Sequence, residues 1–131
     1  MASPVARIPA ASSNRALAHF EALLEFETDC WDVHFAMSNQ RQDFVLLDVR
    51  AESVFQSGHI KGAVNLPHGK INEQSIAAYP AETLFVVYCA GPHCNATEKA
   101  AIRLAKLERP VKKMIGGVTG WVDEGFQLHT C

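Results

Sequence analysis

Two closely spaced cysteines, Cys89 and Cys94, are the residues of this sequence best placed to do chemistry. Cys89 follows an apolar run at residues 84–88, and Gly91 and Pro92 then predict a tight loop before a helix. A strand, a loop and a helix in this order aim backbone N–H groups and the positive end of the helix at one sulfur atom. This setting favours thiolate over thiol, so the pattern suits a nucleophilic cysteine. The alternative is a buried structural cysteine, because free cysteine is among the most frequently buried residue types.

Neither a metal site nor a disulfide scaffold fits the cysteine pattern. Cys89, His93 and Cys94 have no second closely spaced pair of ligands, which zinc sites usually provide. Four cysteines are too few and too unevenly spread to hold together a chain with this much apolar content. We therefore expect no metal and no cofactor, and a reducing compartment, the cytoplasm.

The composition is that of one globular domain. Of the 131 residues, 48% are hydrophobic and 20% are charged, which suffices for a buried core. The formal net charge of −2 gives no field that would attract nucleic acid or an anionic membrane surface. No apolar run approaches the ~20 residues of a membrane-spanning helix. Small molecules or proteins are the expected partners, with no nucleic acid and no membrane.

The elements that must position Cys89 alternate between helices and strands, which predicts an α/β fold with a mostly parallel sheet. We expect strands at residues 44–49, 63–66, 84–88 and 111–115. Helices are expected at residues 51–56 and 95–107, and around Trp121. Before them, a helix over residues 14–26 should pack on the domain, and Thr28 or Asp29 should cap a second helix to Ser38. The chain thus divides into a flexible arm at residues 1–12, a helical extension at 13–43 and the main domain at 44–131.

Three ordered segments, FVLLDVRAESVFQSGHIKGAVNLP, VVYCAGPHCNATEKAAIRL and VKKMIGGVTGW, together resemble the rhodanese family. The resemblance runs over residues 44–126. It implies a doubly wound sheet with helices on both faces, to which this chain adds an N-terminal helix. It also implies a sulfurtransferase: a cysteine attacks a sulfane donor such as thiosulfate or a persulfide, and the resulting persulfide passes sulfur to cyanide, a thiol or a protein. On this match Cys89 is the nucleophile, and the amide cradle comes from Ala90, Gly91, Pro92, His93, Cys94 and Asn95.

Other residues of the resemblance are expected to support the site structurally. Asp48 and Arg50 match a DVR at a strand end, where charged hydrogen bonds should fix the loop and neighbouring segments. His59 and Gly62 match the GHIxGA stretch, which shapes the turn into the next strand. We do not assign His59 as a general base, because amide donors can activate a thiolate without one.

The loop departs from the family pattern in its charge. Many rhodanese loops carry an arginine or lysine near the cysteine, which orients anionic thiosulfate, whereas this loop has only His93. We therefore expect weak thiosulfate turnover and a preference for a persulfide donor. Phosphatases of the same fold place an arginine five residues after the cysteine, and Asn95 stands there in this chain, which argues against phosphate chemistry.

Two questions stay open at the level of sequence. Cys94 either fills space at the start of the helix, which we favour, or forms a disulfide with Cys89 on oxidation or after sulfur release. Disulfide closure requires a Cα separation below ~7 Å. The whole domain is either a sulfurtransferase or a non-catalytic, redox-sensing module that binds a protein partner and uses Cys89 and Cys94. Fold alone does not decide between these functions.

Overall fold

The computed structural model describes residues 1–130 and contains one five-stranded sheet. The strands lie in the order β1-β5-β4-β2-β3, and every pair is parallel. In chain order their bounds are β1 Glu27–Thr28, β2 Val45–Asp48, β3 Val64–Asn65, β4 Phe85–Tyr88 and β5 Val111–Met114. The central strand β4 is buried along its whole length. Its run of apolar and aromatic residues is typical of a strand covered on both faces.

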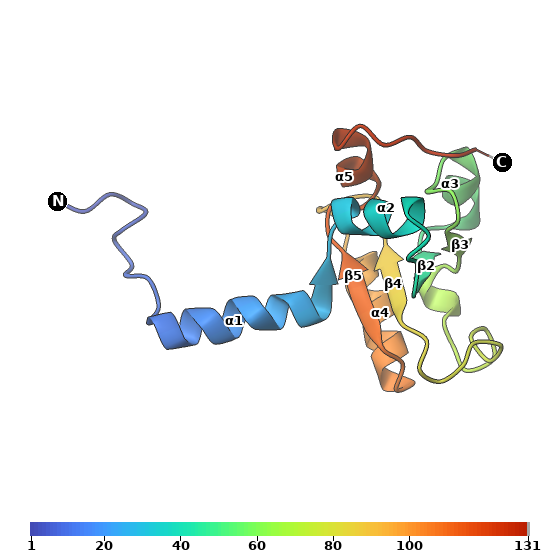
Figure 1. Cartoon of the computed structure of the whole chain (residues 1–131), viewed down its shortest axis with the longest axis horizontal. Helices are drawn as coiled ribbons and strands as arrows, with labels where there is room; N and C mark the ends of the chain where they lie inside the picture. Colours follow the sequence, from blue (N-terminus) through green and yellow to red (C-terminus); the bar gives the residue numbers. More distant parts are fainter. Residues whose placement is uncertain (131) are drawn as a thin grey trace.

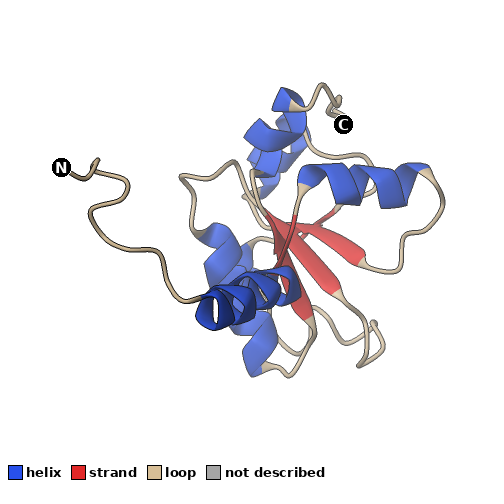
Figure 2. Cartoon of the chain, turned by 60° about the vertical axis from the view of Figure 1, so that its left-hand side comes forward, coloured by secondary structure: helices blue, strands red, loops and turns tan. Residues whose placement is uncertain are grey.

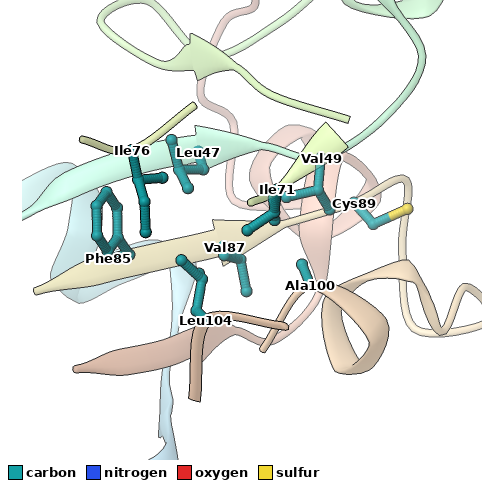
Figure 3. Packing of buried hydrophobic residues seen from close by; sticks show 9 residues of the cluster. All are labelled: Leu47, Val49, Ile71, Ile76, Phe85, Val87, Cys89, Ala100 and Leu104. Atoms are coloured by element: carbon teal, nitrogen blue, oxygen red, sulfur yellow. The ribbon is translucent and has the colours of Figure 1, made fainter. Parts of the chain in front are cut away.

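Helices cover both faces of this sheet (Figure 2). Their bounds are α1 Ser13–Phe26, α2 Cys30–Ser38, α3 Glu52–Ser57, α4 Ala96–Lys106 and α5 Gly117–Asp123, with a 3-10 turn, η1, at His68–Lys70. Because successive strand residues point to opposite faces, β4 contributes to two separate cores. Phe85, Val87 and Cys89 pack with Ala100 and Leu104 of α4 (Figure 3).

The second core lies on the other face, where Val86 and Tyr88 of β4 meet α2 and α5. Val33 of α2 and Trp121 of α5 are buried there. The predicted doubly wound, parallel architecture is confirmed, and Trp121 belongs to the core.

The elements expected from the sequence are present with slightly shorter bounds, and one strand was missed. β1 is a two-residue edge strand that pairs with β5 through Glu27 and Lys113. A segment of two residues has no periodicity that a sequence could reveal. It is a strand because it pairs with β5. Thr28 belongs to β1, so Asp29 alone caps α2, its carboxylate accepting a hydrogen bond from the Asp32 N–H at 2.8 Å.

The prediction that the first helix packs on the domain is wrong for most of its length. α1 projects away from the sheet (Figure 1) and has no buried residue. Its apolar residues Leu17, Phe20 and Leu24 are 60%, 62% and 71% exposed. The helix is tied down only near its end, where Lys112 Nζ donates a hydrogen bond to the Leu24 carbonyl at 2.8 Å. The spacing of apolar residues predicted a helix correctly but carried no information about what would cover them.

Candidate active site

Cys89 lies directly beyond the carboxyl end of β4, between the ends of β2 and β5. The residue is only 4% exposed and forms one end of the core cluster under α4 (Figure 3). In doubly wound sheets, ligands bind beyond this edge of the strands. The fold therefore places the sulfur atom where a small substrate would reach it.

The loop after Cys89 is held from behind by the start of α5. The Val118 N–H donates to the Cys89 carbonyl at 3.0 Å, and the Thr119 N–H donates to the Ala90 carbonyl at 2.9 Å. Thr119 Oγ1 donates a second hydrogen bond to the Ala90 carbonyl at 3.1 Å. These bonds fix the carbonyl groups of the loop on the side of α5.

Gly117 allows this close approach. Its φ is +57°, a left-handed conformation that residues with a side chain rarely adopt. A Cβ atom there would collide with the Cys89 carbonyl oxygen and lie 2.8 Å from the Gly91 nitrogen. The second glycine of the Gly116-Gly117 pair is therefore part of the loop's construction.

Several backbone N–H groups of the loop are available to an anion. The N–H groups of Ala90, Gly91, His93 and Asn95 donate to no acceptor within residues 1–130, whereas the Cys94 N–H donates to the Gly91 carbonyl at 3.1 Å. α4 begins at Ala96, and no side chain caps its N-terminus. The free N–H groups and the positive end of the helix favour a thiolate or a bound anion at this place.

A cavity of about 170 Å³ opens beside Cys89. Its walls come from the loop, from the first turn of α4, from the end of β5 and from the glycine pair. The lining residues are Cys89, Gly91, Pro92, Cys94, Thr97, Glu98, Lys113, Met114, Ile115, Gly116 and Gly117.

Lys113 gives this cavity a cation that sequence reasoning missed. Its Nζ lies 2.7 Å from Glu98 Oε2 and 3.5 Å from Glu27 Oε2. Hydrogen bonds from Lys113 and then Thr97 lower the pKa of Glu98, and the bond to Glu98 raises the pKa of Lys113. One ammonium thus faces two carboxylates. The sequence placed Lys113 on a strand, but only the strand order brings it to Cys89.

The predicted supporting residues gather at a different place. Arg50 binds Asp48 through two nitrogens, with Nη2 2.6 Å from Oδ2, and Nη2 also donates to the Gly58 carbonyl at 2.7 Å. The guanidinium carbon lies 5.9 Å from the ring centroid of Tyr88, the residue before Cys89. The pair thus holds a neighbouring segment, as expected, but within residues 1–130 it makes no hydrogen bond to the loop at 89–95, where we had also expected one.

His59 lies in that second group. Its Nδ1 is 2.8 Å from the Phe55 carbonyl oxygen, and its backbone pairs with His129. The ring of His59 stacks on that of Phe55, with centroids 3.7 Å apart. These contacts hold the connection between α3 and β3 together.

The structure joins Cys89 and Cys94 as a disulfide. Their Cα atoms are 6.5 Å apart, within the range that a disulfide bridges. The favoured interpretation, that Cys94 only fills space at the helix start, is therefore wrong. The spacing of the two thiols could be read from the sequence, but not the curvature of the loop that brings them together.

The fold and the site define a class: doubly wound α/β domains that carry a cysteine at a strand-to-helix loop. Within this class the chain belongs to the rhodanese-like domain family, which it matches over residues 33–124. This membership places it in the sulfurtransferase superfamily. Among residues 1–130, no helix has the length and apolar character needed to cross a membrane.

Two individual proteins are similar to this chain over more than half of its length. The solved structure of the BH2092 protein from Bacillus halodurans is 32% identical, with a TM-score of 0.87 over 91% of this chain and 87% of that one. The HTH-type transcriptional regulator Rv0324 of Mycobacterium tuberculosis is 33% identical over 90 residues. These are 63% of this chain but 39% of that protein, so the chain spans about two fifths of this curated relative.

A third similarity shows the fold alone. The thiosulfate sulfurtransferase of Pseudomonas aeruginosa is 24% identical, with a TM-score of 0.67 over 80% of this chain and 20% of that one.

Proposed function

We propose that this protein is a sulfurtransferase that carries sulfane sulfur as a persulfide on Cys89. The observation that carries the proposal is the position of Cys89, beside unpaired loop N–H groups and the uncapped start of α4. These groups stabilise the attacking thiolate, and they equally stabilise the anion of a persulfide.

The reaction follows from thiol exchange chemistry. The Cys89 thiolate attacks the outer sulfur of a donor persulfide, a new S–S bond forms, and the donor leaves as a thiolate. With thiosulfate as donor, sulfite is the leaving group. A thiol, cyanide or a protein nucleophile then takes the outer sulfur, and the Cys89 thiolate leaves. The N–H groups of Ala90, Gly91, His93 and Asn95, which donate to no acceptor within residues 1–130, bind the charge at each stage.

The charges around the cavity favour a persulfide over thiosulfate as the donor. Glu98 lies in the first turn of α4 and lines the cavity, where it interacts with the positive end of the helix. It also pairs with Lys113, which Glu27 approaches from the other side. Thiosulfate, a dianion, meets three side chains with a net negative charge, whereas the reacting group of a persulfide carries at most one negative charge.

Mass spectrometry tests the proposal directly. The reduced protein is treated without oxygen with one equivalent of a low-molecular-weight persulfide, and the mass of the intact chain is followed over time. We expect a gain of about 32 Da on Cys89, which Cys89→Ser abolishes. Cys94→Ser is measured in parallel, because a disulfide with Cys94 competes with the adduct. If neither the wild type nor Cys94→Ser gains this mass, the proposal is wrong.

A redox-sensing, protein-binding module is the second candidate function. The Cys89–Cys94 disulfide favours it, as does the similarity to a protein described as a transcriptional regulator. A sensor of this kind would change its disulfide state without holding a persulfide. In either function Cys89 must be available as a thiol, so a reducing location such as the cytoplasm belongs to both proposals.

A further inference from the structure

We propose that Cys94 is a second catalytic thiol, which resolves the Cys89 persulfide by forming the Cys89–Cys94 disulfide and expelling hydrosulfide. The inference rests on the proposed persulfide chemistry of Cys89 and adds an activity to it. The protein would release hydrosulfide from persulfides with the help of a dithiol reductant.

The geometry of the loop carries this inference. Cys89 and Cys94 are joined in the structure with their Cα atoms 6.5 Å apart, so the two sulfur atoms meet without rearrangement of the loop. The turn between them is closed by the hydrogen bond from the Cys94 N–H to the Gly91 carbonyl. Two thiols held in this way react as an intramolecular pair, which is far faster than attack by a dilute external thiol.

Cys94 is also suited to act as a thiolate. It is half-buried, lines the same cavity as Cys89 and lies two residues before the start of α4. The uncapped end of this helix favours negative charge there. Cys30 offers a contrast, because it is buried under the glycine pair and burial raises its pKa to about 11.

The step balances without an external oxidant. The Cys94 thiolate attacks Sγ of the Cys89 persulfide, the Cys89–Cys94 bond forms, and the bond from Sγ to the outer sulfur breaks. The outer sulfur takes the bonding electrons and leaves as hydrosulfide. The outer sulfur is thereby reduced and the Cys94 sulfur is oxidised, while the Cys89 sulfur, already bonded to sulfur in the persulfide, keeps its oxidation state. A dithiol such as dithiothreitol or a protein dithiol then reduces the disulfide and restores both thiols.

The cavity assists departure of the product. Hydrosulfide is an anion, and the nearby carboxylates Glu98 and Glu27 outnumber the single ammonium of Lys113. Repulsion between like charges disfavours retention of hydrosulfide next to the new disulfide.

A single-turnover experiment distinguishes this inference from the proposed function. Wild type and Cys94→Ser are fully reduced, freed of reductant and mixed without oxygen with one equivalent of a small persulfide. Hydrosulfide and the intact mass are measured over time. The wild type should release close to one equivalent of hydrosulfide and finish about 2 Da below the reduced mass, with a Cys89–Cys94 peptide. Cys94→Ser should hold the gain of about 32 Da and release hydrosulfide at least about tenfold more slowly.

Three control measurements test whether Cys89 and Cys94 are responsible for these changes. Cys30→Ala should behave as the wild type, Cys89→Ser should do neither step, and wild type without donor should keep its reduced mass. If the wild type and Cys94→Ser hold the added sulfur equally long, the resolving role of Cys94 is wrong while the persulfide function stands. If neither the wild type nor Cys94→Ser ever gains the added sulfur, the proposed function itself fails.

Discussion

At the scale of single residues, the charge beside Cys89 is set by an ion pair rather than by the loop. Glu98 is half exposed, so its pairing with Lys113 is screened by solvent and contributes at most about 1 kcal/mol. Such an energy is too small to decide the fold. It is large enough to change the affinity for a dianion several-fold.

The ion pair leads to a prediction about donor choice. Replacing Glu98 with Gln removes one negative charge and frees Lys113, so the KM for thiosulfate should fall by about three- to tenfold. Replacing Lys113 with Met should raise the same KM. Both constants are measured by thiocyanate formation from thiosulfate and cyanide. Glu21→Gln, on the exposed face of α1, is the matched control; an unchanged KM in Glu98→Gln contradicts the role given to the pair.

Cys30 provides a pH-dependent prediction at the same scale. Burial, followed by the charges of Asp29 and Glu124, raises its pKa from 9.0 to about 11, so the folded protein favours the neutral thiol. This contribution to stability is fully present below pH 9.0 and is lost as the pH rises through about 11. The stability advantage of the wild type over Cys30→Ala should therefore narrow by about 2 kcal/mol between about pH 8 and about pH 10.5. Urea denaturation of both proteins at the two pH values measures this difference in unfolding free energy. A difference that stays the same at both pH values would contradict the raised pKa of Cys30.

At the scale of elements, the start of α5 and the loop after Cys89 are built as one unit. The first N–H groups of α5 bind the carbonyl groups of Cys89 and Ala90, and this is possible only because Gly117 has no side chain. The carbonyl oxygens of Cys89 and Ala90 are thereby occupied by α5. The loop N–H groups that find no acceptor within residues 1–130 are those that would be available to an anion.

Replacing Gly117 with Ala should damage this unit. The new Cβ atom collides with the loop backbone, and the left-handed conformation adds strain, so we expect a loss of about 1–3 kcal/mol in unfolding free energy. Persulfide formation on Cys89 should slow at least about tenfold, because the N–H groups of the loop are displaced. Both quantities come from urea denaturation and from mass spectrometry of the reduced protein.

Gly125→Ala is the matched control for the Gly117 substitution. Gly125 also has a positive φ, of +87°, but a Cβ atom there would meet nothing within 4 Å. It should lose stability through backbone strain alone and keep its rate of persulfide formation. Equal rates for the two variants would show that the close approach at Gly117 is irrelevant to the chemistry.

At the scale of the whole molecule, the sheet order gathers the site from segments far apart in the chain. β4 lies between β2 and β5, so Cys89, the Gly116-Gly117 turn and Lys113 meet at one edge. The buried pair Asp48 and Arg50 ties β2 to the Gly58 carbonyl on the other side of Tyr88. α1 takes no part in either arrangement (Figure 1).

The isolation of α1 predicts that the domain tolerates its removal. Deleting residues 1–22 keeps β1 and the hydrogen bond from Lys112 to Leu24, and should change the unfolding free energy by less than about 1 kcal/mol, because no buried residue is lost. Leu104→Ala, in the core under α4, should by contrast cost about 2–5 kcal/mol. Thermal or urea denaturation measures the unfolding free energy of both variants and of the full chain. A large loss on deletion would mean that α1 contributes to the core after all.

The sequence by itself determined most of the elements and singled out Cys89 as the candidate nucleophile. Apolar runs and helical spacing follow from local physics, so β4, α4 and the loop containing Cys89 could be read from residues 84–107. The predicted role of Cys89 still awaits its test.

Only the tertiary structure decided which distant groups face that thiol. β1 is a strand solely because β5 lies beside it, and Lys113 reaches the cavity solely because β5 neighbours β4. The disulfide between Cys89 and Cys94 depends on the path of the loop that joins them. The apolar side chains of α1 are exposed because no other element packs on them. Contacts between residues far apart in sequence depend on strand order and chain path. Local spacing carries no information about either, so the ion pair of Lys113 and the pairing of Cys94 with Cys89 became visible only in the folded chain.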